Sequence, residues 1–79
     1  MTSNKLPTNI LSRKVVKVLE KDDFIHVRTT ASHRHFKKEG VNTIVTVSVK
    51  KRIPRGTLTN ILKQAGYSKD DFLERLKDI

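Results

Sequence analysis

The sequence predicts an α+β fold in which helices cover one face of a three-stranded antiparallel sheet. Three observations predict it: an amphipathic helical pattern near the start, segments rich in β-branched residues in the middle, and two further helical patterns at the end. Strands grouped together between helices favour separate layers over alternating βα units. A chain of 79 residues fits one domain, residues 1–79, with a thin core.

The first predicted helix covers residues 13–21 and follows an extended N-terminal arm, residues 1–11. Ser12 is expected to cap this helix, because a serine hydroxyl at that position accepts a hydrogen bond from a free amide of the first turn. The apolar stripe that would face the core consists of Val15, Val18 and Leu19, with Val16 beside it.

Three strands are predicted in the middle of the chain, at residues 24–29, 32–38 and 43–49. The first alternates apolar and polar side chains and contains residues that favour strands. The third reads TIVTVSV and is the richest in β-branched residues. A turn at residues 39–42 joins the second strand to the third.

Two helices close the chain. The first covers residues 55–65 after Pro54, which suits a helix start, and Gly66 is a natural stop. Its apolar positions follow helical spacing at Leu58, Ile61, Leu62 and Ala65. Ser68 then caps a short helix, with Asp71 three residues later. Its inward residues would be Phe72, Leu73 and Leu76.

The composition excludes several classes of protein. Because the chain has no cysteine, neither disulfides nor thiolate-bound metals can support its core. The opening residues have no apolar run for a signal peptide, and nowhere do about 18 apolar residues follow one another. We therefore expect a soluble, cytoplasmic protein. No Gly-rich phosphate loop or nucleophile motif is present, so no cofactor is expected.

The positive charge is concentrated in the middle of the chain. The net charge is +9, and residues 24–63 hold nine basic and one acidic side chain, net +8. Residues 1–23 are net +2 and residues 66–79 are net −1. A local basic field favours a polyanionic ligand. The alternative is a solvated face of a basic protein.

The residues expected to contact the phosphates of such a polyanion come from this segment. They are Arg28, Arg34, Lys37, Lys38, Lys50, Lys51, Arg52, Arg55 and Thr57. Free amides at the start of the second helix, near Thr57, would suit a further phosphate. Structurally, the same run is a helix start with a solvated basic loop. With only four aromatic residues in the chain, stacking of unpaired bases is poorly supplied.

Two of the three histidines lie one residue apart in the stretch TTASHRHFKK. In an extended segment residues two apart share a face, so His33 and His35 point one way and Phe36 the other. If Phe36 anchors the core, both histidines lie on the open face. Three interpretations are then open: the histidines are surface residues without a role, they bind a metal ion, or they are catalytic groups. A metal site is disfavoured, because Glu39 is the only nearby carboxylate.

The catalytic interpretation fits the surrounding charge. A histidine exchanges protons near neutral pH. Beside RNA, a neutral imidazole can take the proton from a ribose 2′-hydroxyl, whose oxygen then attacks the adjacent phosphate. Lysine and arginine would stabilise the extra negative charge on phosphorus. This chemistry requires no metal.

Four motifs in order carry a family resemblance: SRKVVKVLEKDDF, ASHRHF, TIVTV and IPRGTLTNILKQAGYSKDDFLERL. Together they resemble the HicA (YcfA-like) toxins, small mRNA interferases of type II toxin–antitoxin modules. The most specific parts are the Ser-His after the first strand and the P-x-G-T-L run with I-L-K-Q-A-G. The resemblance implies a fold like that of double-stranded-RNA-binding domains, cleavage of RNA by a histidine without metal, and silencing by a HicB-like antitoxin.

Carried over to this chain, the resemblance makes His33 the catalytic histidine, with Ser32 and His35 as candidate auxiliary residues. Two positions depart from the family pattern. Ala31 stands where glycine usually precedes Ser-His, and Asp23 stands where glycine usually precedes Phe24. A methyl group at Ala31 is costly if the position requires a positive φ.

The leading hypothesis is therefore an endoribonuclease toxin held inactive by a partner protein. A non-catalytic RNA-binding module would use the same basic face, and a domain that only binds proteins would have no affinity for nucleic acid. His33 distinguishes the first two, because cleavage requires it and phosphate binding does not.

Overall fold

The computed structural model describes residues 5–79; residues 1–4 of the expected N-terminal arm lie outside them. The elements in chain order are β1 (Ile10–Leu11), α1 (Ser12–Lys21), β2 (Ile25–Thr30), β3 (His33–Lys37), β4 (Val45–Ser48), β5 (Arg52–Ile53), α2 (Arg55–Ala65) and α3 (Lys69–Leu76). No helix among the described residues is long and apolar enough to cross a membrane.

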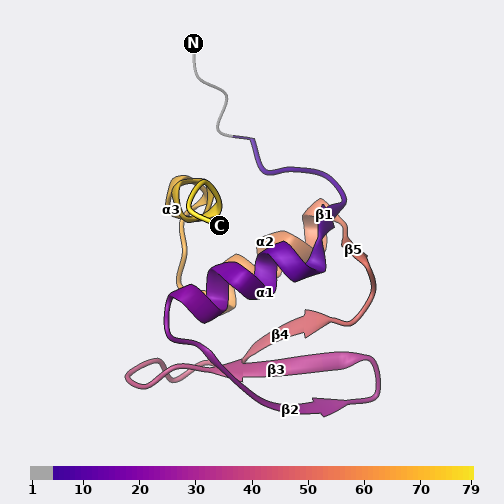
Figure 1. The fold of residues 1–79 in the computed structure, drawn as a ribbon, viewed down its shortest axis with the longest axis vertical. Helices are drawn as coiled ribbons and strands as arrows, with labels where there is room; N and C mark the ends of the chain where they lie inside the picture. Colours follow the sequence, from indigo (N-terminus) through magenta and orange to yellow (C-terminus); the bar gives the residue numbers. More distant parts are fainter. Residues whose placement is uncertain (1–4) are drawn as a thin grey trace.

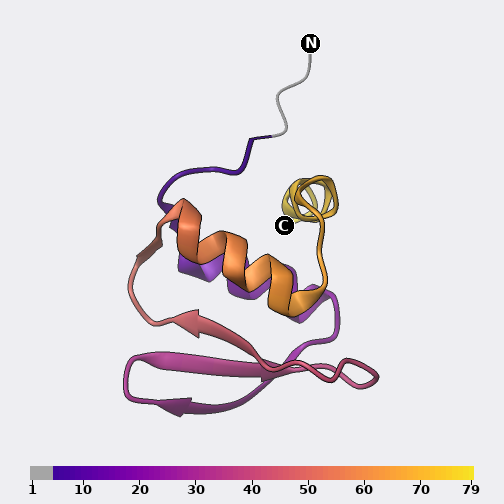
Figure 2. The ribbon, with the colours of Figure 1, turned by 180° about the vertical axis from the view of Figure 1, so that it is seen from behind.

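The predicted α+β class is confirmed. β2, β3 and β4 form an antiparallel sheet in that order. Figures 1 and 2 show α1 and α2 on the same side of this sheet, with α3 farther from it. This arrangement is consistent with the fold of double-stranded-RNA-binding domains.

The core lies between the sheet and the helices. Both predicted helical stripes are buried: Val15, Val18 and Leu19 of α1, and Leu58, Ile61, Leu62 and Ala65 of α2. The sheet contributes Phe36, Val45 and Val47, and Phe72 anchors α3. The apolar spacing read from the sequence therefore identifies the faces that pack together.

The register of the sheet decides which residues face the helices. On the helix side Phe36 pairs with Val45 and Arg34 with Val47, whereas on the open side His33 pairs with Ser48 and His35 with Thr46. Successive side chains of a strand point to opposite faces. The predicted orientation, with Phe36 in the core and both histidines on the open face, is confirmed.

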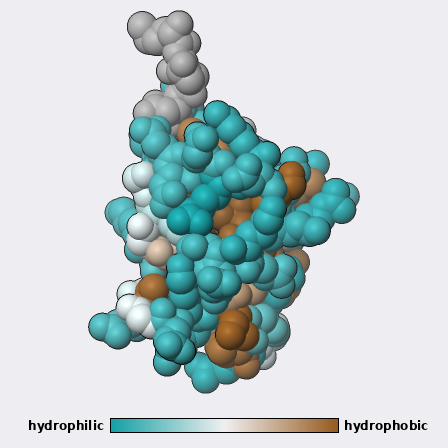
Figure 3. All heavy atoms as spheres, turned by 60° about the vertical axis from the view of Figure 1, so that its left-hand side comes forward, coloured by the Kyte–Doolittle hydropathy of each residue, from teal (hydrophilic) through white to brown (hydrophobic). Residues whose placement is uncertain are grey.

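The two edges of the sheet differ. At β4, the Thr46 amide donates a hydrogen bond of 2.9 Å to Oε1 of Gln64 on α2, so the helix covers this edge. At the other edge every residue of β2 is exposed, including Ile25 at 67% and Val27 at 51%. The register in which β2 pairs with β3 shifts between His26 and Arg28. In Figure 3, brown apolar atoms reach the surface at the lower end, where the sheet lies.

A second sheet is absent from the sequence prediction. Ile10 and Leu11, in the expected arm, pair antiparallel with Ile53 and Arg52. The basic segment after β4 is therefore partly a strand and not only a connector. Each strand has two residues, which is too short for a period of two to appear in the sequence.

The prediction that Ser12 caps the first helix is wrong. α1 begins at Ser12, and its cap residue is Leu11, which makes no side-chain cap hydrogen bond. Ser12 is buried, and its amide donates to the Lys51 carbonyl at 2.9 Å. A neighbouring segment thus satisfies an amide at the helix start, so a side-chain cap is not required there.

The remaining boundaries agree closely. β2 lies one residue later than predicted, and β3 and β4 are shorter than predicted at both ends. α2 has the predicted bounds, and Gly66 ends it in the left-handed region with a φ of 80°. Ser68 caps α3, because its hydroxyl accepts a hydrogen bond of 3.0 Å from the Asp71 amide.

Candidate nucleic-acid interface and histidine site

A tight turn places His33 at the start of β3. Thr30 pairs with His33, so Ala31 and Ser32 alone connect β2 to β3. Ala31 has a φ of 51°, in the left-handed region where a side chain is strained and glycine is not. Asp23 has a φ of 69°. Both positions at which the resembled family usually has glycine therefore adopt positive φ.

His33 is exposed on the open face of the sheet. It lies between Thr30 of β2 and Ser48 of β4, which are its pairing partners. Across residues 5–79 the His33 ring takes part in no hydrogen bond, ion pair or ring contact. Its nitrogens are therefore available to a ligand, and the hydroxyl side chains of its neighbours border the same position.

His35 is half-buried and held by two hydroxyl groups. Its Nε2 lies 2.6 Å from Oγ1 of Thr30, and its Nδ1 lies 3.2 Å from Oγ1 of Thr46. A neutral ring donates one of these hydrogen bonds and accepts the other. The strands on both sides thus fix the orientation of this imidazole, in contrast to that of His33. These threonines are not apparent from the sequence, because the pairing register brings them to the ring.

The predicted cations near the histidines divide between the two faces of the sheet. Arg28 pairs with His35 and is exposed on the histidine face, and Lys37 follows on the same face by alternation. Arg34 lies on the helix side, where its Nε is buried without a hydrogen-bond partner among the described residues. Only the first two therefore share the face of His33.

The basic run Lys50–Arg52 leaves the sheet beside the histidine turn. The Val49 amide donates to the Ser32 carbonyl at 2.9 Å, and the Lys50 amide donates to Oγ of Ser48 at 3.1 Å. Lys50 and Lys51 are exposed. The fold thus brings two cations from the segment after β4 to the end of the sheet where His33 lies.

Three other predicted cations are engaged within the protein. Lys38 forms a 3.0 Å salt bridge with Asp22, Nη1 of Arg52 donates to the Asn9 carbonyl at 3.0 Å, and Nε of Arg55 donates to the Leu6 carbonyl at 3.1 Å. These contacts fix the three side chains in place. Thr57 is exposed in the first turn of α2.

Asp22, at the end of the first helix, joins three segments of the chain. Its carboxylate lies 3.0 Å from both Lys38 and Arg75, and the Tyr67 hydroxyl donates to it at 2.7 Å. Burial raises the pKa of this carboxyl, but the hydrogen bonds from Tyr67 and Lys38 and the charge of Arg75 outweigh burial. The pKa of Asp22 therefore lies below its ordinary value of 3.8.

The same contact acts on Tyr67 in the opposite direction. Burial raises the pKa of its hydroxyl, and the hydrogen bond to the Asp22 carboxylate raises it further. The Arg75 guanidinium lies 4.8 Å from the centre of the ring. Hydroxyl and ring are thus both engaged within the protein.

Metal-binding side chains do not gather anywhere in residues 5–79: no three histidine, aspartate or glutamate side chains lie together. The arrangement that remains is an exposed imidazole beside hydroxyl groups and cations.

The family model of the HicA toxin of bacterial toxin–antitoxin systems matches residues 12–67, more than half of the chain. The matched part begins with α1, includes the histidine turn and the basic run, and ends just after α2. No curated protein matches the chain.

Proposed function

The chain belongs to the HicA toxin family of bacterial toxin–antitoxin systems, and we propose that it is an endoribonuclease that cleaves mRNA in the cytoplasm without a metal ion. The observation that carries this proposal is the exposed ring of His33, which has no partner within residues 5–79 and adjoins the basic run that contains Lys50 and Lys51. RNA supplies both the nucleophile and the polyanion that this combination fits.

In the proposed reaction, His33 acts as the general base. Its neutral ring takes the proton of a ribose 2′-hydroxyl, and the 2′-oxygen forms a bond to the adjacent phosphorus. The bond from phosphorus to the 5′-oxygen breaks, and that oxygen leaves with a proton from a general acid. The products are a 2′,3′-cyclic phosphate and a free 5′-hydroxyl.

The cations supply the electrostatic part of the reaction. Negative charge grows on the phosphoryl oxygens as the 2′-oxygen attacks, and nearby cations stabilise it most when they are already in place. Lys50 and Lys51 follow the hydrogen bond that joins Val49 to Ser32, so they leave the sheet beside His33. Arg28 and Lys37 extend the positive surface along the histidine face.

His35 is the candidate general acid. Its hydrogen bonds to Thr30 and Thr46 hold the ring at one orientation, two residues from His33 and on the same face. A protonated ring would release one of these two hydrogen bonds and pass that proton to the leaving 5′-oxygen. The hydroxyl of Ser32 lies in the turn itself and is an auxiliary contact for the phosphate.

Membership in the family implies an antitoxin partner. We propose that this partner is HicB-like and covers His33 together with part of residues 50–55. A basic catalytic surface is masked most directly by a partner that presents acidic or apolar groups to it. In a complex of the two proteins, a fully exposed His33 would contradict direct masking.

The test is cleavage of a defined RNA in EDTA, with the product ends mapped. Replacing His33 by alanine should lower the cleavage rate by about 10²–10⁴-fold. Thermal stability and RNA binding should hardly change, because the substitution removes only one exposed ring. His35→Ala should cause a similar loss if it is the general acid, and a smaller one otherwise.

His26→Ala is the matched control. His26 is an exposed histidine of the same hairpin, but it pairs with Phe36 and its ring lies 5.5 Å from that ring. Its removal should leave cleavage unchanged. If His33→Ala cuts as fast as the unmodified protein, or if EDTA abolishes activity, the proposed mechanism is wrong. If the unmodified protein and all three histidine variants bind RNA but none of them cleaves it, the result would favour a non-catalytic RNA-binding module.

A further inference from the structure

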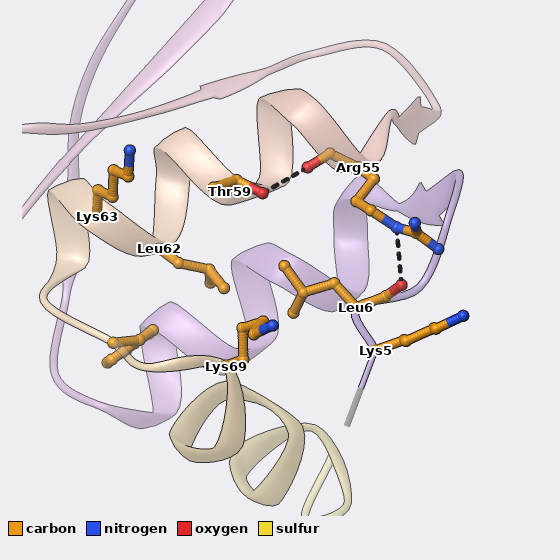
Figure 4. A pocket seen from close by; sticks show the side chains of 8 residues that line it. Lys5, Leu6, Arg55, Thr59, Leu62, Lys63 and Lys69 are labelled. Carbon is orange, nitrogen blue, oxygen red and sulfur yellow. Dashed lines mark hydrogen bonds between the residues drawn. The ribbon is translucent and has the colours of Figure 1, made fainter. Parts of the chain in front are cut away.

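A pocket of about 460 Å³ lies on the helical side of the molecule, away from the histidine face. Its walls come from three segments: the chain before β1, α2, and the connection into α3 with the first residue of that helix (Figure 4). A volume of this size lies within the range of ordinary ligand sites, about 300–1,000 Å³. The proposed RNA chemistry makes no use of it.

The interior of the pocket is apolar. Leu6 and Leu62 line it, and Figure 4 shows their side chains pointing toward each other, with Lys69 below them in this view. Both leucines belong to the buried core. The carbon stems of the surrounding lysines and of Arg55 add further apolar surface. The pocket therefore suits a hydrocarbon side chain better than a polar group.

The rim of the pocket is positive. Among the described residues, the charged lining consists of Lys5, Arg55, Lys63 and Lys69, without a carboxylate. Within residues 5–79, Asp22 pairs with Lys38 and Arg75, Asp71 with Arg75, and Glu74 with Lys77, so these four cations take part in none of these salt bridges. Figure 4 shows Lys5 and Lys63 projecting on different sides of the pocket.

We propose that this pocket docks an acidic segment of a partner protein, which inserts one apolar side chain between Leu6 and Leu62. An apolar anchor matches the interior, and flanking carboxylates match the rim. Complementary charge around a buried apolar contact is the usual arrangement of a specific protein interface. The surface is separate from the proposed cleavage site and does not depend on it.

The structure favours a peptide over RNA at this position. Unpaired bases bind to proteins largely by stacking on aromatic rings. Of the described residues that line the pocket, only Tyr67 is aromatic. Its ring already contacts Arg75 and Phe24, and its hydroxyl donates to Asp22. No free ring is thus available to a base, whereas an apolar side chain requires none.

The experiment is a titration of the isotope-labelled protein with a short synthetic peptide, followed by amide NMR shifts. The peptide consists of glutamate and aspartate around one leucine. Saturable shifts are expected at Leu6, Lys63 and Lys69. Replacing the leucine of the peptide by serine should weaken binding by about tenfold or more, because burial of the leucine is lost.

Two double variants with equal charge change distinguish the pocket from the overall positive charge. Lys63→Glu with Lys69→Glu should weaken peptide binding by about tenfold. Lys14→Glu with Lys17→Glu, on the exposed face of α1, should weaken it by less than about threefold, because neither lysine lines the pocket and exposed charges are screened by salt. RNA cleavage should persist in the Lys63/Lys69 variant, so this test does not depend on the proposed nuclease activity.

Three outcomes would overturn the proposal. In the first, the shifts appear around His33 and Lys50 and not at the pocket. In the second, the serine peptide binds as tightly as the leucine peptide. In the third, a short RNA displaces the peptide from the pocket, which would mark it as a nucleic-acid site.

Discussion

The two ends of β3 carry similar positive charges but use them differently. Beyond its last residue, Lys38 is bound to Asp22, which also holds Arg75 and Tyr67. At its first residue, His33 adjoins Lys50 and Lys51, and among the described residues no carboxylate forms a salt bridge with either lysine. At one end, therefore, the charge of Lys38 joins segments of the fold. At the other end, the charges of Lys50 and Lys51 are available to a ligand.

The distribution of acidic residues explains this difference. They are concentrated at residues 20–23 and 70–78, at the end of α1 and in or next to α3, whereas Glu39 is the only acidic residue of 24–63. α1 and α3 pack together, so most of the acid gathers around one side of the molecule. The histidine end is positive because the fold keeps the acidic residues away from it.

The first prediction tests the structural end and has the largest expected effect on stability. Asp22→Ala should lower the free energy of unfolding by about 2–3 kcal/mol, because it removes two ion pairs and a hydrogen bond from a largely buried carboxylate. Glu20→Ala, at an exposed position of α1, is the control and should change it by less than about 0.5 kcal/mol. Urea denaturation measures both. A loss below that of the control would contradict the role given to Asp22.

The second prediction tests the ligand end. Lys50→Ala with Lys51→Ala should weaken RNA binding about tenfold at physiological salt and reduce the slope of log affinity against log salt by about 1.5. Lys38→Ala should hardly change that slope, because its charge is already neutralised by Asp22. If the slope of log affinity against log salt is the same for the double variant and for Lys38→Ala, the two ends of β3 do not differ in how they bind RNA.

The third prediction concerns pH. Because the pKa of Asp22 is lowered in the folded protein, the unfolded chain takes up this proton at higher pH than the folded chain does. The contribution of Asp22 is thus fully present above about 3.8 and is lost as the pH falls through the folded value. Denaturation of the unmodified protein and of Asp22→Asn should be measured at several pH values. The difference between their free energies of unfolding should become smaller as the pH falls below about 3.8. A constant difference would contradict the lowered pKa.

The fourth prediction has the smallest effect and concerns the turn that presents His33. Ala31→Gly should raise the free energy of unfolding by about 0.5–1 kcal/mol, since glycine adopts a positive φ without strain. Asp23→Gly should raise the free energy of unfolding by less, because aspartate tolerates the left-handed region better than alanine does. Thermal denaturation of the two variants gives the comparison, and a destabilised Ala31→Gly would show that the turn requires the methyl group.

Periodicity in the sequence predicts those parts of the fold whose signal is local. The stripe of Leu58, Ile61, Leu62 and Ala65 identifies α2, and Gly66 and Ser68 mark helix boundaries by their own conformations and hydrogen bonds. The β1–β5 pair and the exposure of every residue of β2 escape prediction, because they depend on which segments meet in space. Ser12 misleads for the same reason: its amide finds a distant carbonyl.

The candidate site divides in the same way. The basic middle segment and the shared face of the two histidines follow from the order of residues alone. The sequence does not separate Lys50 from Lys38, because the partner of Lys38 lies sixteen positions earlier, at Asp22, and meets it only in the folded chain. Nor does it reveal the threonines that hold His35, which lie on two neighbouring strands.

The exposed edge strand has a consequence for motion. β2 buries no side chain, so separating it from β3 exposes little new apolar surface and costs less than unfolding the whole domain. Its amides should exchange with solvent deuterium before those of β4, whose Val45 and Val47 are fully buried. When β2 opens, His35 loses Thr30 but retains Thr46, and its ring gains freedom about a single remaining contact. The rigidity of this imidazole is therefore set by how often the edge of the sheet opens.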